Sequence, residues 1–187
     1  MLMERTAPKF FKRNSALKKF EIGNTVTYSI HGVCVIEDIE KKDFMGSPAE
    51  YYVLKPVGDA RSTVYVPCEN GILTEKMKKV LSVSEIHELI KMMPNENDIW
   101  IDNPHERKKK YAEILSSGDR RALISLIKTL YERREKQKET GKKLHISDES
   151  FLRDAEKLLY EEFAHVLNIK KDQVLPFICS QIEVQEK

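Results

Sequence analysis

Histidine and cysteine, the side chains that most often carry chemistry in proteins, are scattered along this sequence. The histidines are His31, His87, His105, His145 and His165. No two of them are three or four residues apart, which is the spacing that places metal ligands on one helix face. The cysteines, Cys34, Cys68 and Cys179, form no C-x-x-C pair. We therefore expect neither a metal centre nor a disulfide framework, and we interpret the cysteines as single buried apolar thiols.

Nucleophilic catalysis finds no support either. His31 and Cys34 are close in sequence, but Cys34 stands among apolar residues, where a thiol is ordinarily part of the core. The sequence contains no G-x-x-x-x-G-K-[ST], G-x-G-x-x-G or H-E-x-x-H motif. We predict a protein without enzymatic activity.

Two features favour a binding role. The first is a run of four cations, Arg107, Lys108, Lys109 and Lys110. Because consecutive residues surround a helix, at least two of them project outward and can contact successive phosphates; an ordinary solvated face is the alternative. The second feature is Trp100, the only tryptophan, which either wedges against DNA bases or packs between two domains.

The composition of the chain limits the classes of protein to which it can belong. The chain has 187 residues, of which 41% are hydrophobic and 33% charged, which predicts a globular protein of one large or two small domains. No apolar run approaches the roughly 20 residues of a membrane helix, and the first residues lack the apolar core of a signal peptide, so we predict a cytoplasmic protein. Residues 1–19 carry six cations and one carboxylate, and we expect a flexible basic extension that contacts nucleic acid or merely aids solubility.

The first part of the chain has the pattern of a β-sheet. β-Branched and aromatic residues alternate over residues 24–30, 33–40, 50–55 and 62–66, which predicts four strands. Val26, Tyr28 and Ile30 share one face of the first strand, as in a half-buried antiparallel sheet. Short connections link the strands, which favours a small SH3-like or Tudor-like antiparallel β-barrel within residues 20–75.

After Pro67 the apolar period lengthens to three or four residues, which predicts a compact all-α domain over residues 80–187 and an α+β fold for the chain. Polar and proline residues mark the expected helix starts: Ser82 with Glu85, Asn103 with Pro104, Asp119, Ser147 or Asp148, and Asp172. The second helix is expected to end at Gly118, and Pro176 to lie in the first turn of the last.

Taken in order, these motifs resemble those of the CarD family of bacterial transcription regulators, whose N-terminal module is also found in transcription-repair coupling factor. In the first half, the resemblance rests on F-x-I-G-N-x-V-x-Y from Phe20, H-G-V-x-V-I-E-x-I from His31, E-Y-Y-V-L-K from Glu50 and V-P from Val66. In the second half, it rests on S-G-D from Ser117, L-Y-x-R-R from Leu130 and A-E-K-L-L from Ala155. It covers residues 20–163.

The resemblance implies a Tudor-like domain that binds the β subunit of RNA polymerase, followed by a helical domain that contacts promoter DNA at the upstream edge of the transcription bubble. Such a protein tunes open-complex stability and has no enzymatic activity, required cofactor, membrane partner or small-molecule substrate. The alternative is a protein-interaction adaptor with a Tudor-like barrel and no DNA contact.

Positions carry over from the family residue by residue. The polymerase contacts are expected at Lys42, Phe44 and Tyr65, where Tyr65 stands at a position that is often Arg in relatives. Ser29 replaces a common proline. The DNA-wedging Trp of the family corresponds to a position near Pro104, about one helical turn after Trp100.

Overall fold

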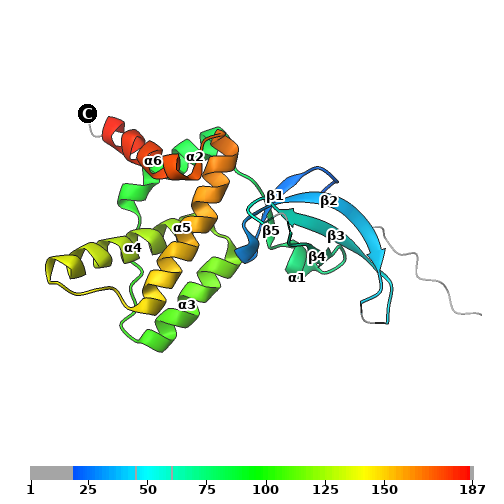
Figure 1. Cartoon of the computed structure of the whole chain (residues 1–187), viewed down its shortest axis with the longest axis horizontal. Helices are drawn as coiled ribbons and strands as arrows, with labels where there is room; N and C mark the ends of the chain where they lie inside the picture. The colour runs from blue at the N-terminus through cyan, green and yellow to red at the C-terminus, as the bar shows by residue number, and fades with distance from the viewer. Residues whose placement is uncertain (1–18, 45, 60, 186–187) are drawn as a thin grey trace, which may run out of the picture.

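The computed structural model describes residues 19–185 except 45 and 60, so nearly all of the predicted basic extension lies outside the described residues. A sheet region, residues 25–79, lies beside a helical region, residues 83–185 (Figure 1). The fold is α+β, as predicted from the change of apolar period after Pro67.

The sheet has five antiparallel strands in the order β4-β3-β2-β1-β5. They are β1 (Thr25–Tyr28), β2 (Val33–Lys42), β3 (Ala49–Pro56), β4 (Val64–Pro67) and β5 (Met77–Lys79). The first four are the predicted strands. The sequence reasoning missed β5 and the short helix α1 (Gly71–Thr74), because three or four residues are too few to display a hydrophobic period.

The sheet is open, which corrects the predicted barrel. Among the described residues, β4 pairs only with β3 and β5 pairs only with β1, so the two outer strands are free edges. A register shift between Ile36 and Asp38 in β2 marks a β-bulge, a feature that bends a strand without closing the sheet.

Alternating residues fill the core of the sheet region, as the period of two predicts. Val26 and Tyr28 are buried, but Ile30 is 60% exposed, because the chain leaves β1 at Ser29 and forms a 3₁₀ turn, η1 (Ser29–His31). Ser29 has a φ of 47°, which a proline ring cannot adopt. A proline therefore could not replace Ser29 on this backbone, and the Ser29 hydroxyl donates to the carbonyl of Ser116.

The helical region contains α2 (Val83–Met92), a 3₁₀ turn η2 (Met93–Asn95), α3 (Pro104–Ser117), α4 (Arg120–Glu139), α5 (Ile146–Leu167) and α6 (Lys171–Gln185). The caps predicted at the first three starts are confirmed at Ser82, Asn103 and Asp119. Gly118 ends α3 with a φ of 59°, the left-handed conformation that glycine adopts without strain.

The predicted starts of the last two helices are wrong. His145 caps α5, and its ring nitrogen Nδ1 accepts from the amide of Ser147. Asp148 lies inside α5 with its side chain buried, where it forms an ion pair with Arg107 of α3. Helix α6 begins at Lys171, which places Asp172 inside the helix and Pro176 beyond its first turn.

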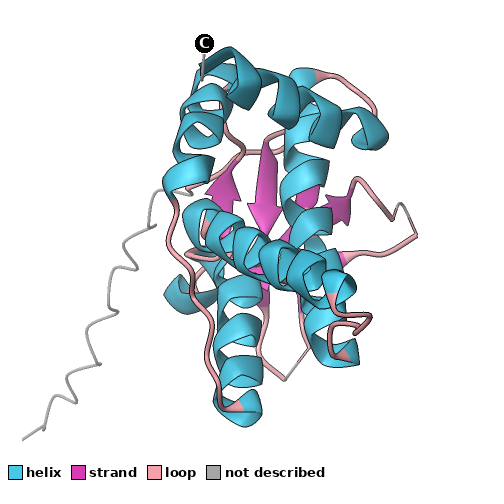
Figure 2. Cartoon of the chain, turned by 90° about the vertical axis from the view of Figure 1, so that its left-hand side faces the viewer, coloured by secondary structure: helices cyan, strands magenta, loops and turns pink. Residues whose placement is uncertain are grey.

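Helix α5 is the centre of the helical region (Figure 1), and Figure 2 shows the helices of this region in front of the strands of the sheet. Its N-terminal half contributes Leu152, Ala155 and Leu158 to a cluster with α3 and α4. Its C-terminal half contributes Leu159 and Phe163 to a second cluster with α2 and α6. A single helix thus connects two separate apolar cores.

A buried ion pair joins the sheet region to the helical region. The Arg120 guanidinium donates to both carboxylate oxygens of Glu162, at 2.8 and 3.1 Å, and to the carbonyl of Lys79 at 2.8 Å and the hydroxyl of Thr27 at 3.1 Å. The Glu162 side chain is only 3% exposed and also accepts from the amide of Leu81. Three groups therefore meet α4 and α5 at one point: the Thr27 hydroxyl of β1, the Lys79 carbonyl of β5 and the Leu81 amide of the following linker.

Gly32 allows this close approach. It has a φ of 68°, and a Cβ atom at this position would lie 2.9 Å from Oε2 of Glu161 in α5. Any other residue would be strained by its backbone and would push against the helix.

Candidate functional site

The three residues predicted to contact polymerase lie together in the structure. Lys42 ends β2, Phe44 follows in the loop and Tyr65 lies on β4. The Phe44 ring meets those of Tyr65 and Tyr51 edge to face, with ring centroids 5.2 and 5.1 Å apart. We call Lys42, Phe44, Tyr51 and Tyr65 the aromatic patch; the sequence reasoning did not single out Tyr51.

The aromatic patch is exposed and has an ion-paired lysine at one end. Phe44 is 55% and Tyr65 38% exposed, which is unusual for large rings that touch one another. The Lys42 ammonium lies 2.7 Å from the Glu40 carboxylate and 5.8 Å from the Tyr65 ring centroid. The hydrogen bond and charge of Glu40 raise the pKa of Lys42, which keeps the ammonium protonated.

The aromatic patch borders a free strand edge. Tyr65 is the second residue of β4, which pairs on one side only among the described residues. An unpaired edge offers backbone donors and acceptors to a strand from a partner, and neighbouring aromatic rings can anchor that strand's side chains. This arrangement can therefore bind a protein by strand addition.

The predicted DNA-contacting residues surround the start of α3. The Trp100 indole stacks with two guanidiniums, with the Cζ atoms of Arg107 and Arg133 at 4.1 and 3.9 Å from its ring centroid. Its Nε1 donates to Oδ1 of Asp102 at 2.9 Å. The side chain is half-buried against the apolar core of α3, α4 and α5, so it packs on the helical region and not between the two regions.

Arg107 is buried, which removes it from the predicted phosphate contacts. Its guanidinium donates to both carboxylate oxygens of Asp148, at 3.2 and 3.0 Å, and to the backbone carbonyls of Ile101 and Asp102. The Arg107 and Asp148 side chains are 8% and 4% exposed. Arg107 therefore holds the linker and supports Trp100 from inside the fold. The exposed part of the basic run consists of the three lysines that follow it.

Lys108, Lys109 and Lys110 are exposed, as the helical geometry of four consecutive cations requires. Among the residues that the structure describes, none of the three forms an ion pair. Three unneutralised ammonium groups on one short stretch of helix can attract a polyanion.

Arg133 and Asp148 were missed as functional candidates. Arg133 appeared only within the L-Y-x-R-R motif, and Asp148 only as a possible helix cap. Both act on partners far along the chain, Trp100 and Arg107, so no local pattern could reveal their roles.

No metal or membrane site is evident in the described part of the chain. There, no group of three His, Cys, Asp or Glu side chains could hold a metal ion. Likewise, no helix in the described ranges is long and apolar enough to cross a membrane. Cys34 is a buried core thiol, as expected, and its burial raises the pKa of the thiol to about 12. Cys68 is only half-buried, and the prediction is wrong for Cys179, which is exposed on α6.

Comparison with known proteins identifies the family. The CarD-like/TRCF RID domain matches residues 20–81, and the CarD C-terminal domain matches residues 88–178. The chain is also 22% identical over 158 residues to the "Putative transcription factor YdeB" of Bacillus subtilis (strain 168), covering 84% of this chain and 99% of that protein. The chain belongs to the CarD-like family, and its role lies in transcription.

The role of the buried Arg107–Asp148 pair beneath Trp100 can be tested by measuring stability. Arg107→Ala leaves the Asp148 carboxylate buried without its partner, and we expect the free energy of unfolding to fall by about 3–5 kcal/mol. Lys108→Ala, the matched control at the exposed neighbour, should change it by less than about 0.5 kcal/mol. Denaturant unfolding followed by Trp100 fluorescence measures both. Equal losses in the two variants would show that the pair does not hold this end of α3.

Proposed function

We propose that this protein regulates transcription by binding RNA polymerase through the aromatic patch and promoter DNA through the start of α3. The single observation that carries the proposal is the convergence of Lys42, Phe44 and Tyr65 on one exposed surface beside the free edge of β4. These residues come from separate segments, and their grouping has no evident role in the core of the sheet region.

The β subunit of polymerase is the proposed partner of the aromatic patch. The matched RID domain supports a polymerase partner in general, and the family resemblance suggests the subunit. Strand addition at β4 supplies backbone hydrogen bonds that are not specific to sequence, whereas Phe44 and Tyr65 supply specific anchors. Tyr65 replaces a common arginine of relatives, so this contact relies on a ring and on the nearby Lys42 for charge.

Promoter DNA is the proposed partner of α3. Lys108, Lys109 and Lys110 present positive charge to phosphates, and Arg133 lies beside Trp100 with its side chain 36% exposed and in an ion pair with Asp98 at 3.5 Å. An indole held between the core and two guanidiniums is fixed in position before binding. A fixed ring loses little entropy when it meets an unstacked base at the edge of the bubble, where the base would replace the more exposed guanidinium of Arg133 on the ring.

The aromatic patch can be tested in the full chain. Phe44→Ala combined with Tyr65→Ser should weaken binding to the purified β subunit by about thirtyfold, since two central aromatic anchors contribute about 2 kcal/mol or more. Ile72→Ser provides the control, because Ile72 is 76% exposed in α1 of the same region and lies outside the aromatic patch. Titration by biolayer interferometry measures both affinities. If the control weakens binding as much as the double variant, a different surface contacts polymerase.

The lysines of α3 can be tested by salt dependence. Lys108→Ser with Lys109→Ser should lower the slope of log affinity for duplex DNA against log salt by about two, because each phosphate contact releases close to one counterion. Lys91→Ser with Lys170→Ser removes the same charge from exposed positions elsewhere and should leave the slope unchanged. A slope unaffected by the α3 substitutions would make these lysines a solvated face and favour the adaptor function.

Trp100 can be tested on opened promoter DNA. Trp100→Ala should shorten open-complex lifetime, because the lost stacking, about 1–3 kcal/mol per base, acts only on unstacked bases. The variant also loses packing against the helical core, so its unfolding free energy is measured in parallel and decay is compared at equal concentrations of folded protein. Polymerase affinity should not change. Unaltered decay alongside a large loss of stability would make Trp100 a packing residue only.

A further inference from the structure

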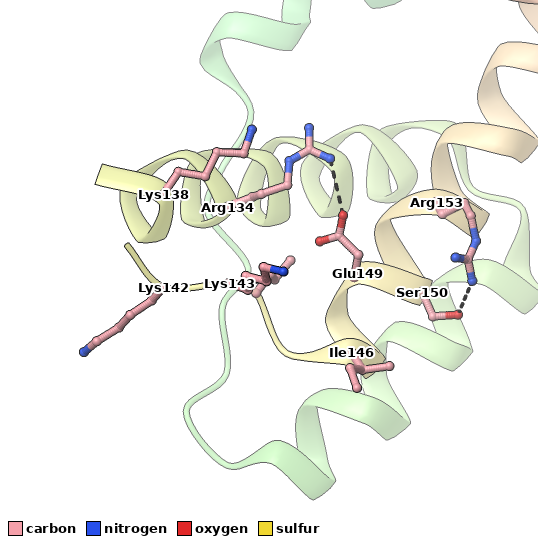
Figure 3. Close-up of a pocket in the computed structure, with 9 residues that line it drawn as sticks. Arg134, Lys138, Lys142, Lys143, Ile146, Glu149, Ser150 and Arg153 are labelled. Atoms are coloured by element: carbon pink, nitrogen blue, oxygen red, sulfur yellow. Dashed lines mark hydrogen bonds and ion pairs between the residues drawn. The ribbon is translucent and has the colours of Figure 1, made fainter. Parts of the chain in front are cut away.

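A second positively charged feature lies away from α3. A pocket of about 570 Å³ opens between the last turns of α4, the loop after it and the first turns of α5 (Figure 3). This volume lies within the range of about 300–1,000 Å³ that small-molecule sites occupy. Neither the aromatic patch nor the lysines of α3 line it.

Cations dominate the lining of the pocket. Arg134, Lys138, Lys142, Lys143 and Arg153 line it against a single carboxylate, Glu149. They come from three different segments of the chain, so they face a common space rather than following one helix face. In Figure 3 the Lys142 side chain extends away from the others, Arg134 and Lys143 lie on one side of Glu149, and Arg153 lies on the other side.

Two of these cations are free to bind a ligand. Within the described ranges, Lys143 and Arg153 have no carboxylate partner; Arg153 donates only to the Ser150 hydroxyl, at 3.0 Å. Arg134 forms longer ion pairs, with Glu149 at 3.7 Å and through its Nε with Glu135 at 3.6 Å, and its buried Nε has no acceptor at hydrogen-bond distance. An unsatisfied buried donor beside unpaired cations favours an incoming anion.

The pocket also has an apolar side. Leu144 is buried beneath it, and Ile146, the first residue of α5, is 87% exposed. A β-branched side chain this exposed at the start of a helix contributes little packing energy to the fold. The positive end of the α5 dipole lies at the same place and adds to the attraction for anions. A ligand suited to these walls combines several negative charges with a flat apolar group.

We propose that this pocket binds a nucleotide carrying a chain of phosphates, with the phosphates on Lys143, Arg153 and Arg134 and the base against Ile146. The site shares no lining residue with the proposed polymerase and promoter contacts. A free nucleotide fits a partly open pocket of this volume, whereas a DNA duplex is too wide to enter it. Two or three linked phosphates match the excess of cations better than a single phosphate does.

Calorimetric titration of the full chain with ATP tests the site. Lys143→Ser combined with Arg153→Ser should weaken ATP binding by about tenfold or more, because two charge-assisted contacts are lost and no buried carboxylate is left unpaired. Lys108→Ser with Lys109→Ser removes the same charge outside the pocket and should change affinity by less than about twofold. ATP should bind at one site and more tightly than AMP.

The apolar wall is tested separately. Ile146→Ser should weaken ATP binding severalfold but leave the binding of inorganic tripolyphosphate unchanged, because only the nucleotide carries a base. Equal effects on both ligands would show that the site recognises phosphate alone and would overturn the assignment to a nucleotide.

Two further outcomes would overturn the proposal. ATP binding that does not saturate, or that both double variants weaken equally, would reduce the pocket to diffuse positive charge. Loss of duplex DNA affinity in the Lys143→Ser, Arg153→Ser variant, with no ATP binding in the parent chain, would assign these cations to a nucleic-acid surface instead.

Discussion

The ion pair between Arg120 and Glu162 is the interaction on which the arrangement of the whole molecule depends. A carboxylate 3% exposed is tolerated only because Arg120 and the Leu81 amide satisfy its oxygens. Loss of one partner from such a pair commonly costs about 3–5 kcal/mol. The pair itself joins α4 to α5 and holds the guanidinium in place, and the hydrogen bonds of that guanidinium to Thr27 and the Lys79 carbonyl fix the sheet region against the two helices. The aromatic patch and the lysines of α3 are therefore presented at a set separation, which a protein that contacts two partners at once requires.

Helix α5 supplies the acidic half of both buried pairs. Glu162 near its C-terminal end holds Arg120, and Asp148 in its first turn holds Arg107. The first pair positions the sheet region and the second positions the linker that carries Trp100. The apolar face of α5 connects the two helical cores between these points. One helix thus places the aromatic patch and the proposed DNA contacts in a common frame.

Sequence reasoning succeeded where the cause of a structure is local. Ser82, Asn103 and Asp119 cap helices by bonding amides two or three residues away, so their patterns were sufficient. It failed where the cause lies elsewhere in the chain: Asp148 resembles a cap but pairs with Arg107, 41 residues away, and that pairing buries one cation of the basic run. The prediction of a closed barrel was wrong for the same reason, since the pairing of β4 and β5 with other strands cannot be deduced from either strand alone. The grouping of Lys42, Phe44 and Tyr65 came from the family resemblance, not from spacing.

The proposed nucleotide pocket and the proposed DNA surface meet on α4. Arg133 stacks on Trp100, and Arg134, the next residue, lines the pocket. Phosphates bound in the pocket would offset positive charge close to Trp100, and at physiological salt such an effect extends about 8 Å. Nucleotide and DNA would then oppose one another, and by linkage each would lower the affinity of the other by the same factor. No movement of the backbone is needed for this coupling, because neutralising the cations is sufficient to change the attraction for DNA.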